Sequence, residues 1–310
     1  MSKIGIIGVG HVGAHCAYTL AITNTIDEIF LIDLKPEKIL SEKYDINDSL
    51  VNFGLKSKVK TGNYDDITDA DILVLSVGKI IGNRLNELET SKAMLDDVIL
   101  KIQSSGFGGI IISITNPCDI MTYYALNKLN WDKYKCFGTG TALDSTRLVG
   151  ELSEYTSISP KSITAYVLGE HGDSQFVSWS TVRFGNFTIE DFKKFYSPQY
   201  CSFDSAKKAE IADNVRNRAG IIYPPKNATE YGIATTLTKI VSAIVNDEKI
   251  ICPLSVLLNG EYNEQDICLS TPCVIDKNGI EAILELPITD DELISLKKSA
   301  EIIRDKIKLL

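Results

Sequence analysis

The chain has 310 residues, enough for two domains with a large core, and its 32 basic and 41 acidic residues give a net charge of −9. Because no block of basic residues stands out, we expect neither nucleic acid nor an anionic membrane surface as a partner. No apolar run reaches transmembrane length and we expect no cleavable leader before the first strand, so the sequence predicts a cytoplasmic protein.

The cysteines are odd in number and scattered through mostly apolar segments, which is typical of reduced core thiols rather than of a disulfide framework. They are Cys16, Cys118, Cys136, Cys201, Cys252, Cys268 and Cys273. The nearest pair, Cys268 and Cys273, has no histidine nearby, so no metal site is predicted.

The first stretch of the chain carries a nucleotide-binding pattern. An apolar run at residues 4–7 stops at Gly8, and a helical apolar pattern follows Gly13. A second apolar run, residues 29–32, ends on Asp33, which lies twenty residues beyond Gly13. A strand, a glycine turn, a helix and an acid at this distance predict the Rossmann dinucleotide fingerprint. The alternative, a glycine turn that packs on a sheet without a ligand, does not account for all four features.

Each residue of this fingerprint has a physical role. Gly8 permits a tight turn, Gly10 lets the backbone approach a pyrophosphate, and Gly13 allows the helix to pack closely on the strand. Val12 belongs to the predicted cofactor-binding set at the start of that helix, whose N-terminus would face the phosphates. Asp33 would accept hydrogen bonds from the adenosine ribose and would repel a 2′-phosphate. The predicted cofactor is therefore NAD rather than NADP.

The elements that follow alternate between helix and strand. Residues 37–50 have helical spacing and suit a surface or an interface helix. Residues 72–75 and 110–114 are continuous apolar runs, typical of strands buried on both faces of a parallel sheet, and residues 88–103 between them are helical in pattern. This alternation predicts an α/β fold with a doubly wound parallel sheet.

The second half has a different character. Residues 163–168 and 176–182 read as strands, residues 229–245 as a helix and residues 250–283 as a meander of strands. A capping box that begins at Thr289 predicts a final amphipathic helix.

This change predicts two domains: a Rossmann domain over residues 1–140 and an α+β substrate-binding domain over residues 141–310. In a doubly wound sheet the ligand lies at the carboxyl ends of the strands. Gly78 and Asn116, which follow two of the apolar runs, are therefore predicted to contact the cofactor.

Only one of the three histidines is available for chemistry away from the glycine turn, since His11 and His15 belong to that turn and its helix. His171 follows a predicted strand and is flanked by glycines, where a side chain can face a cleft. Imidazole is suited to proton transfer near neutral pH. A single loop histidine is nevertheless more often structural, so its partners decide between the two interpretations.

Asp144 and Arg147 lie three residues apart on a predicted helix and share a face. The simpler interpretation is a surface ion pair of little energetic consequence. The functional interpretation is a carboxylate that orients His171 and a guanidinium that binds a substrate carboxylate through two hydrogen bonds.

Together these motifs resemble the lactate/malate dehydrogenase family over the whole chain. The resemblance is carried by residues 8–13 with Asp33 and by the segments 115–117, 140–147 and 169–174. Within that family, residues 168–183 and the Gly-Thr-Gly-Thr run from Gly138 are most similar to the L-2-hydroxyisocaproate type.

The resemblance implies reversible hydride transfer between NADH and a small 2-oxo acid. His171 would donate and accept the proton, Asp144 would hold its tautomer, and Arg147 would bind the substrate carboxylate. Asn116 would contact the reacting carbonyl, and Arg84 would polarise that carbonyl from a mobile loop. Without the resemblance we would interpret Arg84 as a solvated loop cation.

The resemblance also places Thr229 in the wall of the substrate pocket. The loop from Gly78 to Arg84 is shorter than in typical family members and holds no extra arginine for a second carboxylate. Malate is disfavoured, because a dicarboxylate would bury a charge without a partner, the nearest cation being Lys79. The isoleucines near the pocket favour an apolar substrate side chain; they are Ile80, Ile81 and Ile233.

The predicted function is thus an NAD-dependent L-2-hydroxy-acid dehydrogenase of the hydroxyisocaproate type, acting on a small-molecule 2-oxo monocarboxylic acid. The alternatives are L-lactate dehydrogenase and, less favoured, malate dehydrogenase or a catalytically silent NADH sensor, which would not need the full set of five polar residues. We expect no activation by fructose bisphosphate, because Val149 and Thr164 stand where the effector cations would be. A homo-oligomer, either a dimer or a tetramer without an N-terminal arm, is expected.

Overall fold

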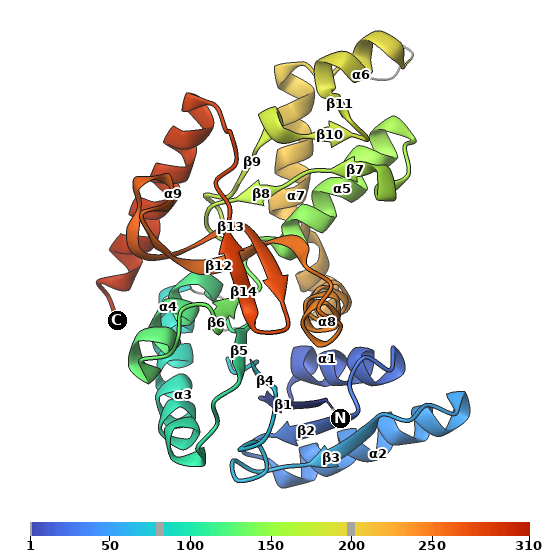
Figure 1. The fold of residues 1–310 in the computed structure, drawn as a ribbon, viewed down its shortest axis with the longest axis vertical. Coiled ribbons are helices and arrows are strands. Elements are labelled where there is room, and N and C mark those ends of the chain that lie inside the picture. The colour runs from blue at the N-terminus through green and yellow to red at the C-terminus, as the bar shows by residue number, and fades with distance from the viewer. Residues whose placement is uncertain (1, 79–83, 197–201) are drawn as a thin grey trace.

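A computed structural model describes residues 2–78, 84–196 and 202–310 of the chain. Its main element is a nine-stranded mixed sheet with the strand order β14-β13-β12-β6-β5-β4-β1-β2-β3 (Figure 1). All neighbouring strands from β6 to β3 are parallel, and β12, β13 and β14 extend the sheet as antiparallel strands. The predicted doubly wound α/β architecture is confirmed.

The first half of the chain alternates strands with helices. Its elements are β1 (Lys3–Ile7), α1 (His11–Ile22), β2 (Glu28–Ile32), α2 (Pro36–Phe53), β3 (Lys58–Thr61), β4 (Ile72–Leu75), α3 (Arg84–Ser105), β5 (Ile110–Ser113), α4 (Cys118–Leu129) and β6 (Cys136–Gly138). Every residue of β2, β4 and β5 is buried. Strands covered by helices on both faces need apolar side chains on both faces, which is why these strands are continuous apolar runs.

The second half begins with a long helix and several short strands. These elements are α5 (Ala142–Thr156), β7 (Ile163–Thr164), β8 (Val167–Leu168), β9 (Phe176–Val177), β10 (Arg183–Phe184), β11 (Phe187–Thr188), α6 (Ile189–Phe195), α7 (Ser205–Lys226) and α8 (Tyr231–Val245). The prediction of single strands over 163–168 and 176–182 is wrong in extent. The first is divided because β7 pairs with β10 whereas β8 pairs with β9, and the second gives way to a 3₁₀ helix at Trp179–Thr181.

The predicted meander is present as β12 (Ile250–Asn259), β13 (Gln265–Asp276) and β14 (Gly279–Ile283). It joins the first sheet through the pairing of Ser255 with Gly138. The domain boundary predicted between residues 140 and 141 lies between β6 and α5 and stays a prediction, since one sheet continues across it. The chain ends in α9 (Asp290–Ile307), which begins with the predicted capping box of Thr289 and Glu292.

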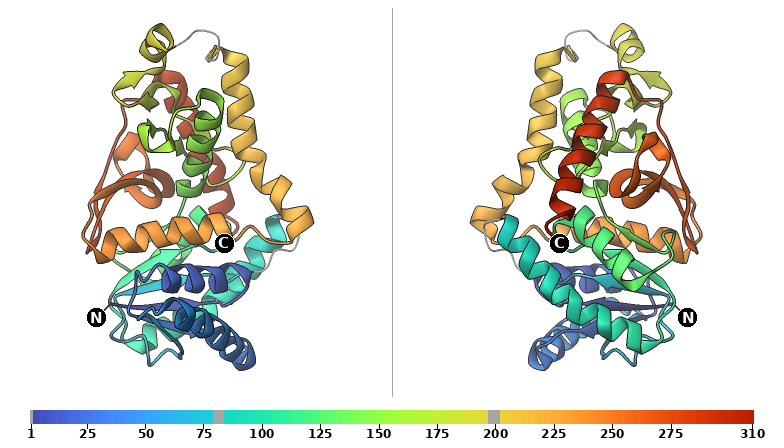
Figure 2. Two further views of the ribbon diagram at one scale, coloured as in Figure 1. Left: turned by 90° about the vertical axis from the view of Figure 1, so that its right-hand side faces the viewer. Right: turned by 90° about the vertical axis from the view of Figure 1, so that its left-hand side faces the viewer.

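Helices from both halves cover the sheet. In the two opposite views of Figure 2, α1 and α8 lie toward the viewer on one side, and α3 and α4 on the other. One hydrophobic core extends from Ile4 in β1 to Ile303 in α9 and so includes both halves of the chain. A smaller core lies between α5, α6, α7 and the short strands. Among the described helices, none is both long enough and apolar enough to cross a membrane.

Some predicted positions fall outside the described residues. They are Lys79, Ile80, Ile81 and Cys201. The backbone of α3 begins at Arg84, but the Arg84 side chain also lies outside what the structure describes. The other six cysteines are buried thiols.

The glycine turn provides a stability test with a matched control. A β-carbon at Gly13 would lie 2.0 Å from the Gly8 carbonyl oxygen, whereas one at Gly10 would meet no atom within 4 Å. We expect Gly13→Ala to lower the free energy of unfolding by about 3 kcal/mol or more, because backbone must move to relieve the overlap. Gly10→Ala should leave it nearly unchanged. Urea unfolding of the two variants measures this difference, and equal stabilities would contradict it.

Candidate functional site

A cleft of about 850 Å³ opens beside the glycine turn, at the carboxyl ends of the parallel strands. Four of the predicted cofactor residues line it, namely Gly8, Gly10, Asp33 and Gly78. The other predicted members lie outside its lining: Val12, Gly13 and Asn116. The sequence did not single out several side chains that complete the wall, including Ile32, Tyr64, Met94 and Val98. A ligand site at this edge of the sheet is where a doubly wound fold places one.

The polar groups at the cleft suit a dinucleotide. Gly10 is the N-cap of α1 and has no side chain to cap the helix, so the first amides of α1 can bind an anion. Asp33 accepts hydrogen bonds from the backbone N–H of Val9 (2.7 Å) and of Lys35 (3.1 Å). Asp33 therefore also holds the glycine turn against the end of β2, a role that the sequence did not predict. The open turn, the carboxylate and the apolar wall together fit a cofactor such as NAD.

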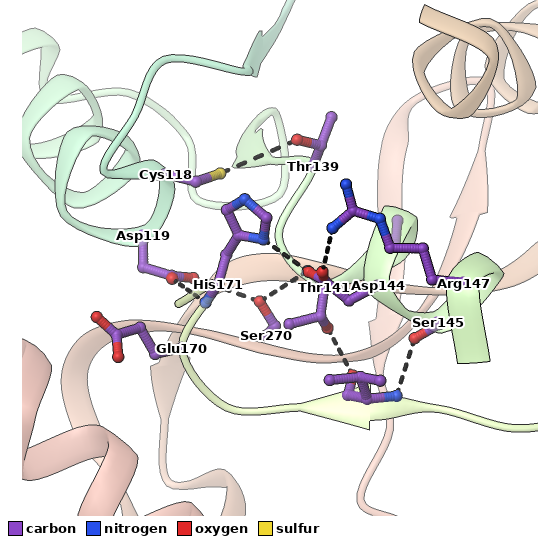
Figure 3. A network of polar contacts seen from close by, with 12 residues as sticks. Cys118, Asp119, Thr139, Thr141, Asp144, Ser145, Arg147, Glu170, His171 and Ser270 are labelled. Carbon is purple, nitrogen blue, oxygen red and sulfur yellow. Dashed lines mark hydrogen bonds and ion pairs between the residues drawn. The ribbon is translucent and has the colours of Figure 1, made fainter. Parts of the chain in front are cut away.

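The second centre is formed by three side chains that point toward one another (Figure 3). His171 Nδ1 lies 2.7 Å from Asp144 Oδ2, and Arg147 donates a hydrogen bond of 3.0 Å to Asp144 Oδ1. The Asp144 side chain is only 2% exposed. The simpler interpretation of Asp144 and Arg147 as a surface ion pair is therefore wrong, because the carboxylate is buried, the guanidinium is only 10% exposed, and His171 shares the carboxylate.

The two titratable groups of this centre stabilise each other's charged form. Burial alone would lower the pKa of His171, but the Asp144 carboxylate outweighs it and raises the pKa above the ordinary 6.5. Burial would likewise raise the pKa of Asp144, but His171 and Arg147 hold it below 3.8. The arrangement favours an imidazolium beside a carboxylate. Since His171 Nδ1 is hydrogen-bonded to Asp144, His171 Nε2 is the nitrogen that can exchange a proton with a ligand.

The remaining predicted site residues are less fully placed. Asn116 lies between β5 and α4, and its backbone carbonyl accepts a hydrogen bond of 2.8 Å from the Ser91 hydroxyl of α3. Thr229 is half-buried in the segment between α7 and α8. The first turn of α8, which follows this segment, packs against α5, since a β-carbon at Gly232 would lie 3.0 Å from the Leu143 side chain. The roles predicted for these residues and for Arg84 stay predictions.

Sequence reasoning missed a set of buried polar residues that supports this centre. Asp119, in the first turn of α4, accepts a hydrogen bond of 2.7 Å from the backbone N–H of His171. Its other carboxylate oxygen accepts one of 3.3 Å from the Ser270 hydroxyl, which in turn accepts one of 3.2 Å from the Thr141 N–H. No sequence signal joins these positions, because Asp119 and Ser270 are 151 residues apart.

The two other histidines lie at a different place, where α1 meets the start of α8. His15 Nδ1 lies 3.1 Å and His11 Nδ1 3.7 Å from the same Glu230 carboxylate oxygen. Glu230 is buried and also pairs with Lys226. This cluster ties the helix of the glycine turn to the second half of the chain and includes neither His171 nor Asp144.

Comparison with family models covers nearly the whole chain. Residues 2–138 match the NAD binding domain of lactate/malate dehydrogenase, and residues 141–310 match its alpha/beta C-terminal domain. The N-terminal half is thus an NAD-binding domain, which confirms the predicted cofactor.

Individual relatives agree. The chain is 38% identical to L-lactate dehydrogenase 1 of Bifidobacterium longum, covering 98% of this chain and 96% of that protein. It is 37% identical to L-lactate dehydrogenase 3 of Bacillus cereus, covering 99% and 98%. Among solved structures, the ligand-bound minor L-lactate dehydrogenase of Enterococcus mundtii superposes with a TM-score of 0.94 at 32% identity, covering 100% of this chain and 98% of that one. The chain therefore belongs to the lactate/malate dehydrogenase family.

Proposed function

We propose that this protein is an NAD-dependent L-2-hydroxy-acid dehydrogenase that interconverts L-lactate and pyruvate. The observation that carries the proposal is the His171 imidazole held on a buried carboxylate that also holds Arg147. Such a group provides a proton donor and a carboxylate-binding cation together, as the reduction of a 2-oxo acid requires. The names of the relatives favour lactate over the hydroxyisocaproate type that the sequence predicted.

In the proposed mechanism Arg147 binds the substrate carboxylate and orients the carbonyl toward His171. When bound, NADH supplies the hydride that reduces C2. The His171 imidazolium donates its Nε2 proton to the carbonyl oxygen, and Asp144 stabilises the charge and orientation of the ring throughout. Asn116 and Arg84 are proposed to stabilise the negative charge that develops on this oxygen. In the reverse direction neutral His171 accepts the proton of the hydroxyl group.

A second candidate is a dehydrogenase for 2-oxo acids with larger apolar side chains. It is favoured by the short loop between Gly78 and Arg84 and by Ile233, which is half-buried in α8. The same features leave a dicarboxylate without an evident cation, so oxaloacetate is the least favoured substrate. We propose that residues 1–140 bind the cofactor and that residues 141–310 provide the substrate-binding groups other than Asn116 and Arg84.

The order of substrates tests the proposal directly. We expect kcat/KM for pyruvate to exceed that for 2-oxoisocaproate, phenylpyruvate and oxaloacetate when NADH oxidation is followed by absorbance. A preference for the branched or aromatic acids would favour the second candidate. NADH binding without turnover of any 2-oxo acid would indicate a sensor instead and overturn the proposal.

The proton donor is tested by His171→Gln. We expect kcat to fall by roughly 100- to 10,000-fold, because no other group then supplies the proton, while NADH binding measured by fluorescence stays unchanged. His15→Gln is the matched control, since His15 also lies beside a buried carboxylate but outside the proposed centre. Near-normal turnover of His171→Gln would remove this residue from the mechanism.

The pH dependence follows from the raised pKa of His171. Reduction needs the imidazolium, so kcat/KM for the 2-oxo acid should fall as the pH rises through this pKa, with a midpoint above 6.5. Oxidation of the hydroxy acid needs neutral imidazole and should rise over the same range. Asp144→Asn should move both midpoints to lower pH, because the neighbouring negative charge is removed. Midpoints that do not move in this variant would refute the assignment.

A further inference from the structure

Asp119 is a buried carboxylate that the proposed mechanism does not use. It is 2% exposed and lies in the first turn of α4, immediately after the segment that contains Asn116. The N-cap residue, Pro117, makes no side-chain cap, and the Asp119 carboxylate accepts its hydrogen bonds from outside the helix. A negative charge at a helix N-terminus is stabilised by the helix dipole.

The partners of Asp119 link it to the proposed catalytic centre. One oxygen accepts the N–H of His171 itself, and the other accepts the hydroxyl of Ser270 (Figure 3). Ser270 accepts the N–H of Thr141, the residue that precedes α5 and hence Asp144 and Arg147. Asp119 thus connects the backbone of the proton donor with the start of the helix that carries its carboxylate partner.

The directions of these hydrogen bonds indicate the ionised form of Asp119. Both of its oxygens receive a donor, and an ionised carboxylate is an acceptor only. The Ser270 hydroxyl donates its single proton to Asp119, and its oxygen accepts the Thr141 N–H. The hydrogen bonds therefore run in one direction, from Thr141 through Ser270 to Asp119. Burial raises the pKa of Asp119 above its ordinary 3.8, and the backbone N–H and the charge of His171 oppose this rise.

We infer that Asp119 is a positioning residue for catalysis, which fixes the backbone of His171 relative to α5 and adds negative charge near the imidazole. This inference rests on the proposed function. A shift of a reacting group by about 1 Å can cost on the order of 100-fold in rate, so loss of the anchor of the His171 backbone should slow the reaction.

Several charged groups determine the protonation of His171 together. Asp144 and Asp119 raise its pKa, and Arg147 lowers it. Glu170, beside His171 in the chain, faces Asp119 and is paired with Lys306 of α9. The thiols of Cys118 and Cys268 also lie near Asp119. Removing the Asp119 charge should therefore lower the pKa of His171 while Asp144 still holds it up.

Two substitutions separate position from charge. Asp119→Asn keeps an acceptor oxygen for the His171 N–H but removes the charge, whereas Asp119→Ala removes both. We expect kcat for pyruvate reduction to fall by about 100-fold in the alanine variant and by less than about tenfold in the asparagine variant, with smaller changes in KM. The midpoint of the pH profile should move down by roughly half a unit in the asparagine variant. NADH affinity should be unchanged in both.

The controls separate this role from a general loss of stability. Asp276→Asn is the control, because Asp276 is another buried carboxylate that accepts a backbone N–H. It lies at the end of β13, the strand that contains Ser270, and about 20 Å from Ser270. This variant should leave kcat and the pH midpoint at wild-type values. If Asp119→Ala does not fold, Asp119→Asn and Ser270→Ala decide, the latter with an expected loss of kcat of a few fold and unchanged NADH affinity.

The outcomes distinguish the two proposals. A wild-type protein that turns over no 2-oxo acid refutes the proposed function. The inference alone is refuted if the wild type is active and two results hold. Asp119→Asn has a normal kcat and an unmoved pH midpoint, and Asp119→Ala, or Ser270→Ala if the alanine variant does not fold, has a normal kcat. Equal losses of kcat in the Asn and Ala variants with an unmoved midpoint also refute it, since they indicate a purely structural role.

Discussion

The interaction on which the site depends is the pairing of the buried Asp144 carboxylate with two cations. Its two oxygens contact different partners, His171 on one and Arg147 on the other. A carboxylate with so little exposure is stable only when it is paired, and loss of one partner of a buried ion pair typically costs about 3–5 kcal/mol. The same contact therefore keeps the imidazole protonated and the guanidinium oriented, so that one carboxylate sets both the chemistry and the substrate geometry.

One continuous sheet supports both the cofactor cleft and the Asp144 pairing. The parallel strands end at the cleft, and the antiparallel strands β12 and β13 continue the sheet into the second half. Ser270 of β13 exchanges two backbone hydrogen bonds with Gly169, just before His171, and its hydroxyl meets Thr141 and Asp119. The loop that carries His171 and the start of α5, which carries Asp144, are therefore both hydrogen-bonded to β13.

Much of the fold and part of the site could be predicted from local patterns. The buried strands β2, β4 and β5, the glycine turn and the capping box at Thr289 were all recognised correctly, because each depends on residues close in the chain. Asp144 and Arg147 shared a predicted helix face for the same reason. The strand predicted over 163–168 was wrong because its two ends pair with different partners, and pairing is not encoded in hydrophobic periodicity.

The sequence by itself determined the type of fold, the cofactor and the side chains available for chemistry. Glycine spacing, apolar runs and the scarcity of histidine are properties of short segments, and short-range sterics and burial patterns decide what such segments form. Only the tertiary structure decided that Asp144 is buried, that it is shared between His171 and Arg147, and that Asp119 holds the His171 backbone. These features depend on contacts between distant segments and on exclusion of water, and both arise only when the chain has folded.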